Sequence, residues 1–570
     1  MTVRTAISAG GAAKVLNRAR AMLRSWRLGA LVPSIAIVAV VMLPICVIAA
    51  IALSGTADDW PHLATYVLPQ AFGVTLTLVA LVAMGTALVG VSCAWIVVTY
   101  DFPFRRLLTW ALILPLAVPP YLAAYAFGEF FTFTGPVQSG LRSLFGFQTP
   151  RDYWFPDIRS TGGAALVMVS VLYPYVYLTT RAVFILQGRN MFEVARTLGG
   201  SPLRVLMRVQ LPVARPAIAA GVALVLMETL NDIGASTYLG VRTLTTSVYT
   251  TWLNRGSLEG AAQIAMLMLV AVFALVMTEQ WARRNQRYHP ARGTQIRARP
   301  ARVRLTGWRA GLAILFVLVP FVSGFGVPVY VFADYASRRM QQLYEPALMN
   351  ALANSLLTAF WASVLAIVAA LVLLNAARVA RSRPATILAR LPVVGYAIPG
   401  TILSLGLLFA LAAIDNWIDG QARQYFGYST GLLLTGSATA VVLACAIRFL
   451  ALAEGSIRSG LDKLPPNLDE AARTLGRTPL RAGVSILLPL LTPAILAAMI
   501  LVFVDTVKEL SATMLLRPFG FNTLATFVYE NASRGAVEDG AIASLLIIAT
   551  ALIPVALLSS ALMRDREASF

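Results

Sequence analysis

The stretch EVARTLG at residues 193–199 returns as EAARTLG at residues 470–476, so one seven-residue motif occurs twice with a single difference. The same offset of 277 residues relates Pro202 to Pro479, and further identities share it. Repetition at a fixed offset indicates a duplicated structural unit. We therefore expect the chain to consist of two tandem copies of one unit.

The composition indicates that lipid surrounds both copies. The 570 residues are 58% apolar and 13% charged, whereas a soluble domain carries roughly a quarter charged residues. Apolar blocks such as 31–54 and 73–98 are long enough to cross about 30 Å of hydrocarbon as helices. The pattern predicts an all-α polytopic membrane protein with about 12 transmembrane helices, near residues 30–54, 73–99, 107–131, 163–187, 213–233, 260–282, 308–333, 350–378, 388–413, 429–452, 490–515 and 540–563. The first block is too long for a signal peptide and is expected to be an uncleaved helix.

Each copy holds six spans, so both copies share one orientation and form a parallel repeat. With the N-terminus inside, roughly 35 of the 46 Lys and Arg residues fall in cytoplasmic segments, as the positive-inside rule requires. The net charge of +20 is therefore a topology signal, and we expect no nucleic-acid partner. The expected division is a cytoplasmic N-terminal segment (1–29), a first six-span unit (30–282), a basic cytoplasmic linker (283–307), a second six-span unit (308–563) and a cytoplasmic tail (564–570).

A cytoplasmic loop between the fourth and fifth spans of each half carries the repeated motif, at residues 190–212 and 467–489. Each loop is expected to form a short helix that ends at a glycine, followed by a second helix. Ser201 or Thr478 would cap the second helix, with proline at its first position. We call each helix-turn-helix segment an elbow. Its apolar side suits a groove on a partner protein, and the plainer alternative is an amphipathic loop at the membrane surface.

The elbows resemble the signature of the membrane permeases of bacterial binding-protein-dependent ABC importers. That signature is Glu-Ala-Ala, three variable residues, Gly, nine variable residues, Ile, one variable residue and Leu-Pro. The second elbow matches it throughout, whereas the first has Val194 for Ala and Val209 for Ile, which are conservative changes. The matching residues are Glu193, Ala195, Gly199, Leu211 and Pro212 in the first elbow and Glu470, Ala471, Ala472, Gly476, Ile486, Leu488 and Pro489 in the second.

The resemblance covers essentially the whole chain and implies a type I ABC importer permease fold in a bacterial inner membrane, with both termini cytoplasmic. It implies that the matching residues couple the chain to a separate cytoplasmic ABC ATPase homodimer, with one elbow docked on each subunit. Closure of that dimer on ATP would push both elbows together and switch the pore from inward-open to outward-open. A periplasmic solute-binding protein would deliver the solute, and ATP and Mg would be bound by the partner.

The chain contains only three lysines, Lys14, Lys463 and Lys508, and none follows a glycine. A P-loop needs the sequence Gly-Lys-Ser/Thr to cradle phosphates. We therefore expect a transport subunit that is not an enzyme and binds no cofactor of its own. Energy must come from another polypeptide or from an ion gradient, so a gradient-driven secondary transporter is the alternative of a different class, and a membrane scaffold is a third.

Four carboxylates are expected within the fifth spans, at equivalent positions of the two halves: Glu228, Asp232, Asp505 and Glu509. A spacing of four residues places each pair on one face of a helix, and charges inside membranes usually mark a pathway or a partner. These carboxylates either line the route of a cationic solute or hold helices together through Lys508 or backbone donors. His62 and His289 are expected on opposite sides of the membrane, so no metal site is assigned.

The solute is suggested by further resemblance. The stretches LMETLNDIGASTYLG (226–240) and VKELSATMLLRPFGFNTLATFVYE (507–530) look most like those of fused ferric-iron importers. Fused thiamine permeases share the architecture, and unfused polyamine, sulfate and phosphonate permeases share the elbow. Pro119-Pro120 and Pro399-Gly400 interrupt the third spans, where they would serve as hinges, expose carbonyl groups to a cavity, or serve packing alone.

Overall fold

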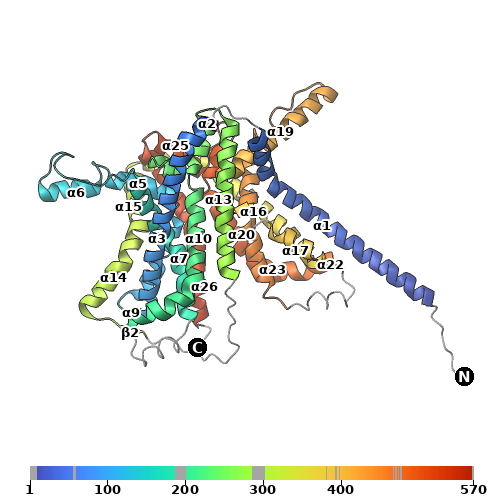
Figure 1. Cartoon of the computed structure of the whole chain (residues 1–570), viewed down its shortest axis with the longest axis horizontal. Helices are drawn as coiled ribbons and strands as arrows, with labels where there is room; N and C mark the ends of the chain where they lie inside the picture. Colours follow the sequence, from blue (N-terminus) through green and yellow to red (C-terminus); the bar gives the residue numbers. More distant parts are fainter. Residues whose placement is uncertain are drawn as a thin grey trace. The chain divides into compact units, whose positions relative to one another are not determined.

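The computed structural model describes residues 9–54, 60–186, 201–284, 302–380, 382–391, 395–396, 398–465, 468, 472, 474 and 478–567. Almost all of the described chain is helical, as expected (Figure 1). The first half contains α1 (Ala9–Ser54), α2 (Trp60–His62), η1 (Leu63–Val67), α3 (Leu68–Thr99), α4 (Arg105–Ala111), η2 (Leu114–Ala117), α5 (Pro120–Phe131), α6 (Pro136–Phe145), α7 (Thr161–Leu186), α9 (Pro202–Val205), η3 (Leu206–Gln210), α10 (Leu211–Asn231), α11 (Gly234–Tyr238), α12 (Leu244–Leu253) and α13 (Leu258–Arg284).

The second half repeats this order of long and short helices. It contains α14 (Gly307–Phe321), η4 (Val322–Gly326), α15 (Val327–Arg338), η5 (Met340–Tyr344), α16 (Pro346–Ala380), α17 (Arg383–Arg390), α19 (Gly400–Phe426), α20 (Thr439–Leu461), α22 (Pro479–Ala482), η6 (Gly483–Leu487), α23 (Leu488–Val507), α24 (Ser511–Leu516), α25 (Leu524–Ser533), η7 (Val537–Gly540) and α26 (Ala541–Glu567). The chain is thus a polytopic helical membrane protein.

Eleven helices of the described chain are long and apolar enough to cross a membrane, and a bent pair brings the number to twelve. The bent pair is the predicted third span, where residues 105–117 and 120–145 meet at 99°. The third span, expected at 107–131, therefore corresponds to this bent pair. Pro119 has an extended backbone, with φ −60° and ψ 148°, and two successive prolines remove the amide donors that a continuous helix needs. The expected interruption at Pro119-Pro120 is confirmed.

The fifth span of each half also ends earlier than its predicted bounds of 213–233 and 490–515. Helix α10 ends at Asn231, and α23 ends at Val507. In each half a short helix, α11 or α24, follows after a break of a few residues. Both breaks contain charged residues, Asp232 in the first half and Lys508 and Glu509 in the second, and apolar residues resume after each break.

The described contacts divide the chain into two compact units that interleave in sequence. The smaller unit comprises Met1–Cys46, Leu357–Tyr396 and Gly406–Thr506, and the larger comprises Val47–Leu356, Ala397–Leu405 and Val507–Phe570. The larger unit therefore combines most of the first half with the beginning and the end of the second. Contacts between the two sequence halves can be described within it.

Helices α3, α7 and α10 form the centre of the larger unit and run roughly parallel in Figure 1. Small residues let them approach closely. A Cβ atom added at Gly90 of α3 would lie 2.9 Å from the backbone nitrogen of Tyr177, and one at Gly221 of α10 would lie 2.8 Å from the Cα atom of Val176. Helix pairs in membranes gain stability from such close backbone contact. Both glycines lie against α7 and both contact Val176.

One short parallel strand pair interrupts the helical fold. Strand β1 (Tyr100–Asp101) pairs with β2 (Val303–Arg304), with Tyr100 opposite Val303. Asp101 also accepts a hydrogen bond at 3.1 Å from the Arg105 side chain. The pair joins the turn after α3 to the residues that precede α14.

In the smaller unit, α1 packs against α19 and α20 against α23. A Cβ atom at Gly406 would lie 2.2 Å from the carbonyl oxygen of Pro44, and one at Gly460 would lie 2.5 Å from the Cβ atom of Ala494. The Ser456 hydroxyl donates a hydrogen bond to the Ala494 carbonyl at 3.3 Å. Close contact through small residues is therefore common to both units.

Candidate functional site

The second helix of each elbow begins as predicted. Ser201 caps α9, because its hydroxyl accepts a hydrogen bond from the Arg204 amide at 3.4 Å, and Pro202 occupies the first helical position. Thr478 accepts the equivalent bond from the Arg481 amide at 3.4 Å. Both N-caps are confirmed. Hydroxyl caps of this kind satisfy one of the amides that a helix start leaves without a partner.

Each elbow continues directly into the fifth span through a single π-helical turn. These turns, Leu206–Gln210 in η3 and Gly483–Leu487 in η6, occupy equivalent positions 277 residues apart. A π-turn accommodates an extra residue within a helix and is often found at functional sites. The second helix of each elbow and the fifth span thus form one continuous helix, which would transmit a push on that helix to the span.

The structure describes part of the predicted coupling set. Leu211, Pro212 and Ile486 are half-buried, Leu488 and Pro489 are exposed, and Ala472 is buried. The remaining predicted residues, Glu193, Ala195, Gly199, Glu470, Ala471 and Gly476, lie outside the described residues. Their roles stay predictions.

Two apolar side chains at equivalent elbow positions extend into the surroundings. Met207 is 60% exposed and Val484, 277 residues later, is 61% exposed. Neither residue belongs to the predicted coupling set. Their sequence signal is only that an apolar residue recurs at the offset of 277.

The carboxylates after the fifth spans act as helix caps. Asp232 accepts hydrogen bonds from the Ala235 amide at 3.3 Å, the Ser236 amide at 2.9 Å and the Ser236 hydroxyl at 3.1 Å. Glu509, at the equivalent position, accepts the Ala512 amide at 2.8 Å. Both carboxylates therefore satisfy the first amides of the short helices α11 and α24.

This geometry corrects the expectation that each carboxylate pair lies on one helix face. The backbone leaves the helix at Asp232, where φ is −73° and ψ is 126°, so Asp232 lies beyond the helix that carries Glu228. Glu228 is half-buried and lies within electrostatic reach of Asp232. Asp505 is also half-buried and belongs to the smaller unit. The described residues contain no group of three or more His, Cys, Asp or Glu side chains that could hold a metal ion.

The two halves meet at these breaks. The Ser511 hydroxyl donates a hydrogen bond at 3.1 Å to the backbone oxygen of Asn231, a residue 280 positions earlier. A Cβ atom at Gly234 would lie 2.6 Å from the Tyr121 Cβ atom and 2.7 Å from the Leu510 Cδ2 atom. A side chain at residue 234 would therefore need one of these neighbours to shift. We call this contact, residues 231–234 against 509–511, the junction.

A pair of equivalent long-range bonds positions the helices that follow the junction. The Thr75 hydroxyl accepts the Leu244 amide at 2.9 Å, and the Ser355 hydroxyl accepts the Leu524 amide at 2.7 Å. Each bond spans 169 residues and ties the start of α12 or α25 to the second span of the same half. The only sequence signal for them is the shared 280-residue offset of the hydroxyl residues and of the motifs LTTSVY and LATFVY.

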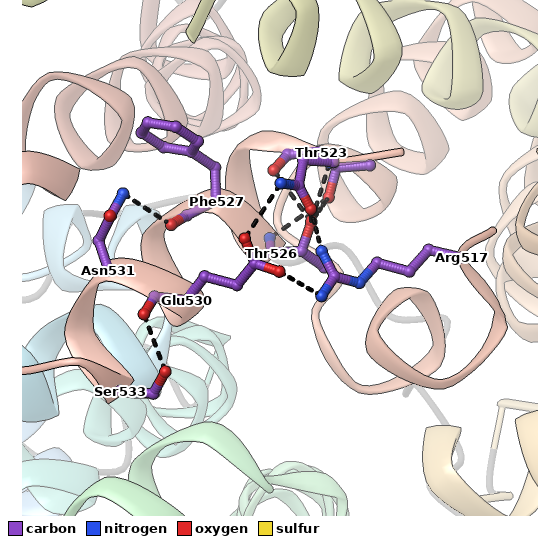
Figure 2. Close-up of polar contacts among 8 residues, drawn as sticks. Arg517, Thr523, Thr526, Phe527, Glu530, Asn531 and Ser533 are labelled. Carbon is purple, nitrogen blue, oxygen red and sulfur yellow. Dashed lines mark hydrogen bonds and ion pairs between the residues drawn. The ribbon is translucent and has the colours of Figure 1, made fainter. Parts of the chain in front are cut away.

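The second half adds a charged network that the first half lacks (Figure 2). Arg517 forms an ion pair with Glu530 and a hydrogen bond with Asn522, and the Asn522 side-chain amide donates to Glu530 at 3.1 Å. The network closes the loop that joins α24 to α25. Arg517 also lies within electrostatic reach of Tyr249 from the first half. The position equivalent to Glu530 is Thr250, which carries no charge.

A cavity of about 480 Å³ lies where α5, α6 and the loop before α7 meet. Its lining includes Glu129, Gln138, Asp157, Arg159 and Tyr238. Arg159 lies over the Tyr238 ring at 5.3 Å from its centroid. The cavity therefore offers both signs of charge together with aromatic surface.

The loop beside the cavity is held by Asp152. Its carboxylate accepts the amides of Gln148 and Thr149, both at 2.7 Å. These bonds, that from Thr149 first, lower the pKa of Asp152 below its ordinary value because they stabilise the ionised form. A charged Asp152 thus fixes the loop at neutral pH.

Comparison with known proteins identifies relatives that transport several solutes. The chain is 25% identical over 489 residues to an Fe(3+)-transport system permease protein of Haemophilus influenzae, a match that covers 85% of this chain and 88% of that one. A putative 2-aminoethylphosphonate transport system permease protein of Salmonella choleraesuis is 30% identical over 205 residues, or 35% of this chain and 70% of the relative. A molybdenum transport system permease protein of Escherichia coli is 25% identical over 229 residues, or 39% and 96%.

The family model of the binding-protein-dependent transport system inner membrane component matches twice, at residues 86–279 and 362–564. The two matches together cover more than half of the chain, and each contains one elbow and one fifth span. This pattern confirms the duplicated organisation and the type I permease fold. The chain therefore belongs to the family of binding-protein-dependent transport system inner membrane components and is a fused, two-unit ABC importer permease, a transport subunit and not an enzyme.

Proposed function

We propose that this permease carries ferric iron into the cell, that a periplasmic solute-binding protein delivers the iron, and that a separate cytoplasmic ABC ATPase homodimer drives the transport. The observation that carries the proposal is the pair of elbows with the same cap and the same π-turn in both halves. A two-fold ATPase needs two equivalent contacts, and the two halves supply one each. A gradient-driven transporter would have no need for two equivalent elbows.

The coupling step follows from the continuity of elbow and span. In this proposal Glu193, Ala195, Gly199 and their counterparts Glu470, Ala471, Ala472 and Gly476 form the helices that dock on the ATPase. Met207 and Val484 add exposed apolar surface beside them. Closure of the ATPase dimer would bring the elbows together, and the unbroken helices that run into α10 and α23 would move the far ends of the fifth spans.

Several observations support iron as the solute. A relative that matches most of the chain is an Fe(3+)-transport permease. The carboxylates Glu228, Asp232, Asp505 and Glu509 favour a cation over the oxyanions named for shorter relatives. Thiamine, a polyamine or another small solute is the alternative within the same class.

The proposed orientation places both termini and both elbows in the cytoplasm of a bacterium and the junction near the external face. Its support is the positive-inside distribution of Lys and Arg. The units 30–282 and 308–563, with the segments 1–29, 283–307 and 564–570 on the cytoplasmic side, complete this topology. No part of the proposal requires a cofactor on this chain, because ATP and Mg belong to the ATPase.

The test is reconstitution of the chain with the ATPase and binding protein encoded beside it. Vesicles that contain Mg-ATP should take up ferric iron from the loaded binding protein, and the ATPase should copurify with the chain in a fixed ratio. The double variant Glu193→Ala and Glu470→Ala should lose both uptake and copurification. Glu345→Ala is the matched control, since this exposed carboxylate lies outside both elbows. Uptake that needs no ATPase and collapses with an ionophore would instead establish a gradient-driven transporter.

A further inference from the structure

Helix α5 carries two deeply buried phenol groups that face the junction. Tyr121 is 4% exposed and Tyr125 is 1% exposed, and their ring centroids lie 5.9 Å apart. Neither hydroxyl has a hydrogen-bond partner among the described residues. Buried hydroxyl groups normally find a partner, so a group without one calls for an explanation.

Both phenols lie beside the carboxylates of the junction. Gly234 places the backbone of the junction against Tyr121, and Glu509 lies within electrostatic reach of the Tyr121 hydroxyl. Asp232 lies within electrostatic reach of Tyr125. Each of the two phenols therefore has a carboxylate of the junction within electrostatic reach.

A third oxygen at the junction also lacks a partner. The side-chain oxygen of Asn231 is buried and without a hydrogen bond among the described residues, although the Asn231 backbone oxygen accepts the Ser511 hydroxyl. We call Tyr121, Tyr125, Asn231, Asp232 and Glu509 the oxygen cluster. It combines three neutral oxygen groups with two carboxylates and draws on both halves of the chain.

The duplication provides an independent sign that this position has a role. Thr401 follows Pro399 as Tyr121 follows Pro119, so the two are equivalent. Thr401 is fully buried, belongs to the same unit, and has a hydroxyl without a described partner. A buried hydroxyl without a partner at the same place in both halves is not expected from packing alone.

The cavity beside α6 gives access toward the cluster. Tyr238 lines that cavity, and its ring meets the Tyr125 ring edge-on at 4.7 Å between centroids. The Tyr238 ring therefore lies between the cavity and Tyr125 of the oxygen cluster. Rotation of this ring, or separation of the halves at the junction, would join the two spaces.

We infer that the oxygen cluster is a transient binding site for the transported cation, which Tyr121, Tyr125 and Asn231 contact through their side-chain oxygens when the two halves separate. This inference rests on the proposed function, because it needs a cationic solute and an ATP-driven separation of the halves. Hard cations are bound through oxygen, by carboxylates and neutral oxygen groups together. In the described structure the halves are in contact and the three oxygens have no partner. The cation would be their partner when the halves separate.

The test compares tyrosine variants that remove only an oxygen atom. In the reconstituted complex, with ferric iron on the binding protein as probe, the double variant Tyr121→Phe and Tyr125→Phe should lower the maximal uptake rate at least tenfold. The KM for the loaded binding protein should stay unchanged, because both phenols are buried and offer no surface to a docked protein. ATP hydrolysis should persist, so the amount of iron moved per ATP falls.

Tyr173→Phe is the matched control. Tyr173 is fully buried on α7, and its hydroxyl also lacks a partner among the described residues. The ionisable groups within electrostatic reach of it are Cys93 and Tyr177, and neither is a carboxylate. It should transport at the wild-type rate. Asn231→Leu, which is similar in volume, should behave like the double tyrosine variant and guards against misfolding of any one protein.

The outcomes separate this inference from the proposed function. If the wild-type complex imports iron with ATP and the double variant does so within twofold of Tyr173→Phe, the oxygen cluster is not a cation site and the inference is overturned. An equal loss in Tyr173→Phe would also overturn it, because the effect would then reflect packing. If the wild-type complex imports no iron, the proposed solute itself is wrong.

Discussion

Replacement of the four fifth-span carboxylates by amides separates their structural role from a role in transport. The variant combines Glu228→Gln, Asp232→Asn, Asp505→Asn and Glu509→Gln. Each change keeps an oxygen that accepts hydrogen bonds while it removes the negative charge. We expect the variant to fold, to bind the ATPase, and to lose uptake of the cation.

The magnitudes come from the caps and from Coulomb's law. Asn caps a helix about as well as Asp, so the amide at residue 232 retains acceptance of the α11 amides at nearly the same stability. A cation 4 Å from a carboxylate gains about 4 kcal/mol at an effective dielectric constant of 20. A tenfold change in rate corresponds to about 1.4 kcal/mol, so loss of even one such contact should lower uptake more than tenfold.

The alanine variants Asp232→Ala and Glu509→Ala provide the contrast. They remove the caps of α11 and α24, and each should cost roughly 0.5–2 kcal/mol of stability. A detergent-solubilised sample should therefore aggregate at a lower temperature than the amide variant. Fluorescence-detected size-exclusion chromatography after a heating series measures this difference.

The decisive assay is uptake of ferric iron by vesicles, normalised to the ATPase content. An amide variant that assembles normally and transports within twofold of the wild type would refute the reasoning. In that case the carboxylates are structural caps alone, and the cationic route lies elsewhere. An amide variant that fails to assemble would contradict the expectation that an amide oxygen suffices for capping.

Three further predictions concern packing, long-range bonding and pH. Gly90→Leu should destabilise the protein by about 1–3 kcal/mol or prevent assembly, because the backbone of α7 would lie 2.9 Å from the new Cβ atom. Gly73→Leu, at an open position of the same helix, should show little effect in the same heating assay. Thr75→Val should cost about 1–3 kcal/mol, since it leaves the buried Leu244 amide without an acceptor, and Thr75→Ser should restore it. The pKa of Asp152 is lower in the folded protein than in the unfolded chain. The stabilisation by the Asp152 carboxylate is therefore fully present above the ordinary aspartate pKa of about 3.9 and is lost as the pH falls through the lowered pKa. Carboxyl NMR titration of Asp152 should show a midpoint below that of an unfolded peptide.

Features that depend on local sequence could be predicted well. The apolar blocks define the spans because a helix is the simplest structure that satisfies all backbone groups in lipid. Ser201 and Thr478 were identifiable as caps because the cap, the following proline and the elbow pattern lie within a few residues. The duplication was evident because the 277-residue offset relates many residues at once.

Features that depend on tertiary contacts could not be predicted. Asp232 looks like part of the fifth span, because it follows the long apolar run of that span and its role as a cap appears only when α11 is seen to begin after a break. The bond from Leu244 to Thr75 joins residues 169 positions apart, and neither residue type announces it. Tyr121 and Tyr125 are unremarkable aromatic residues in sequence, since the absence of a partner is a property of their surroundings in the fold.

The two halves share the contacts that shape the backbone and differ in those that set local charge. Thr243 and Thr523 both cap the helices after the junction, and each helix start is tied to a hydroxyl of the second span. Only the second half closes its loop through Arg517 and Glu530, whereas the first half has Arg242, an exposed cation, in the corresponding loop. A solute that passes between the halves would therefore meet equivalent backbone geometry but unequal charge on its two sides. In the proposed function, equivalent geometry would let one ATPase dimer move both halves together, and unequal charge would place a bound cation closer to one wall than to the other.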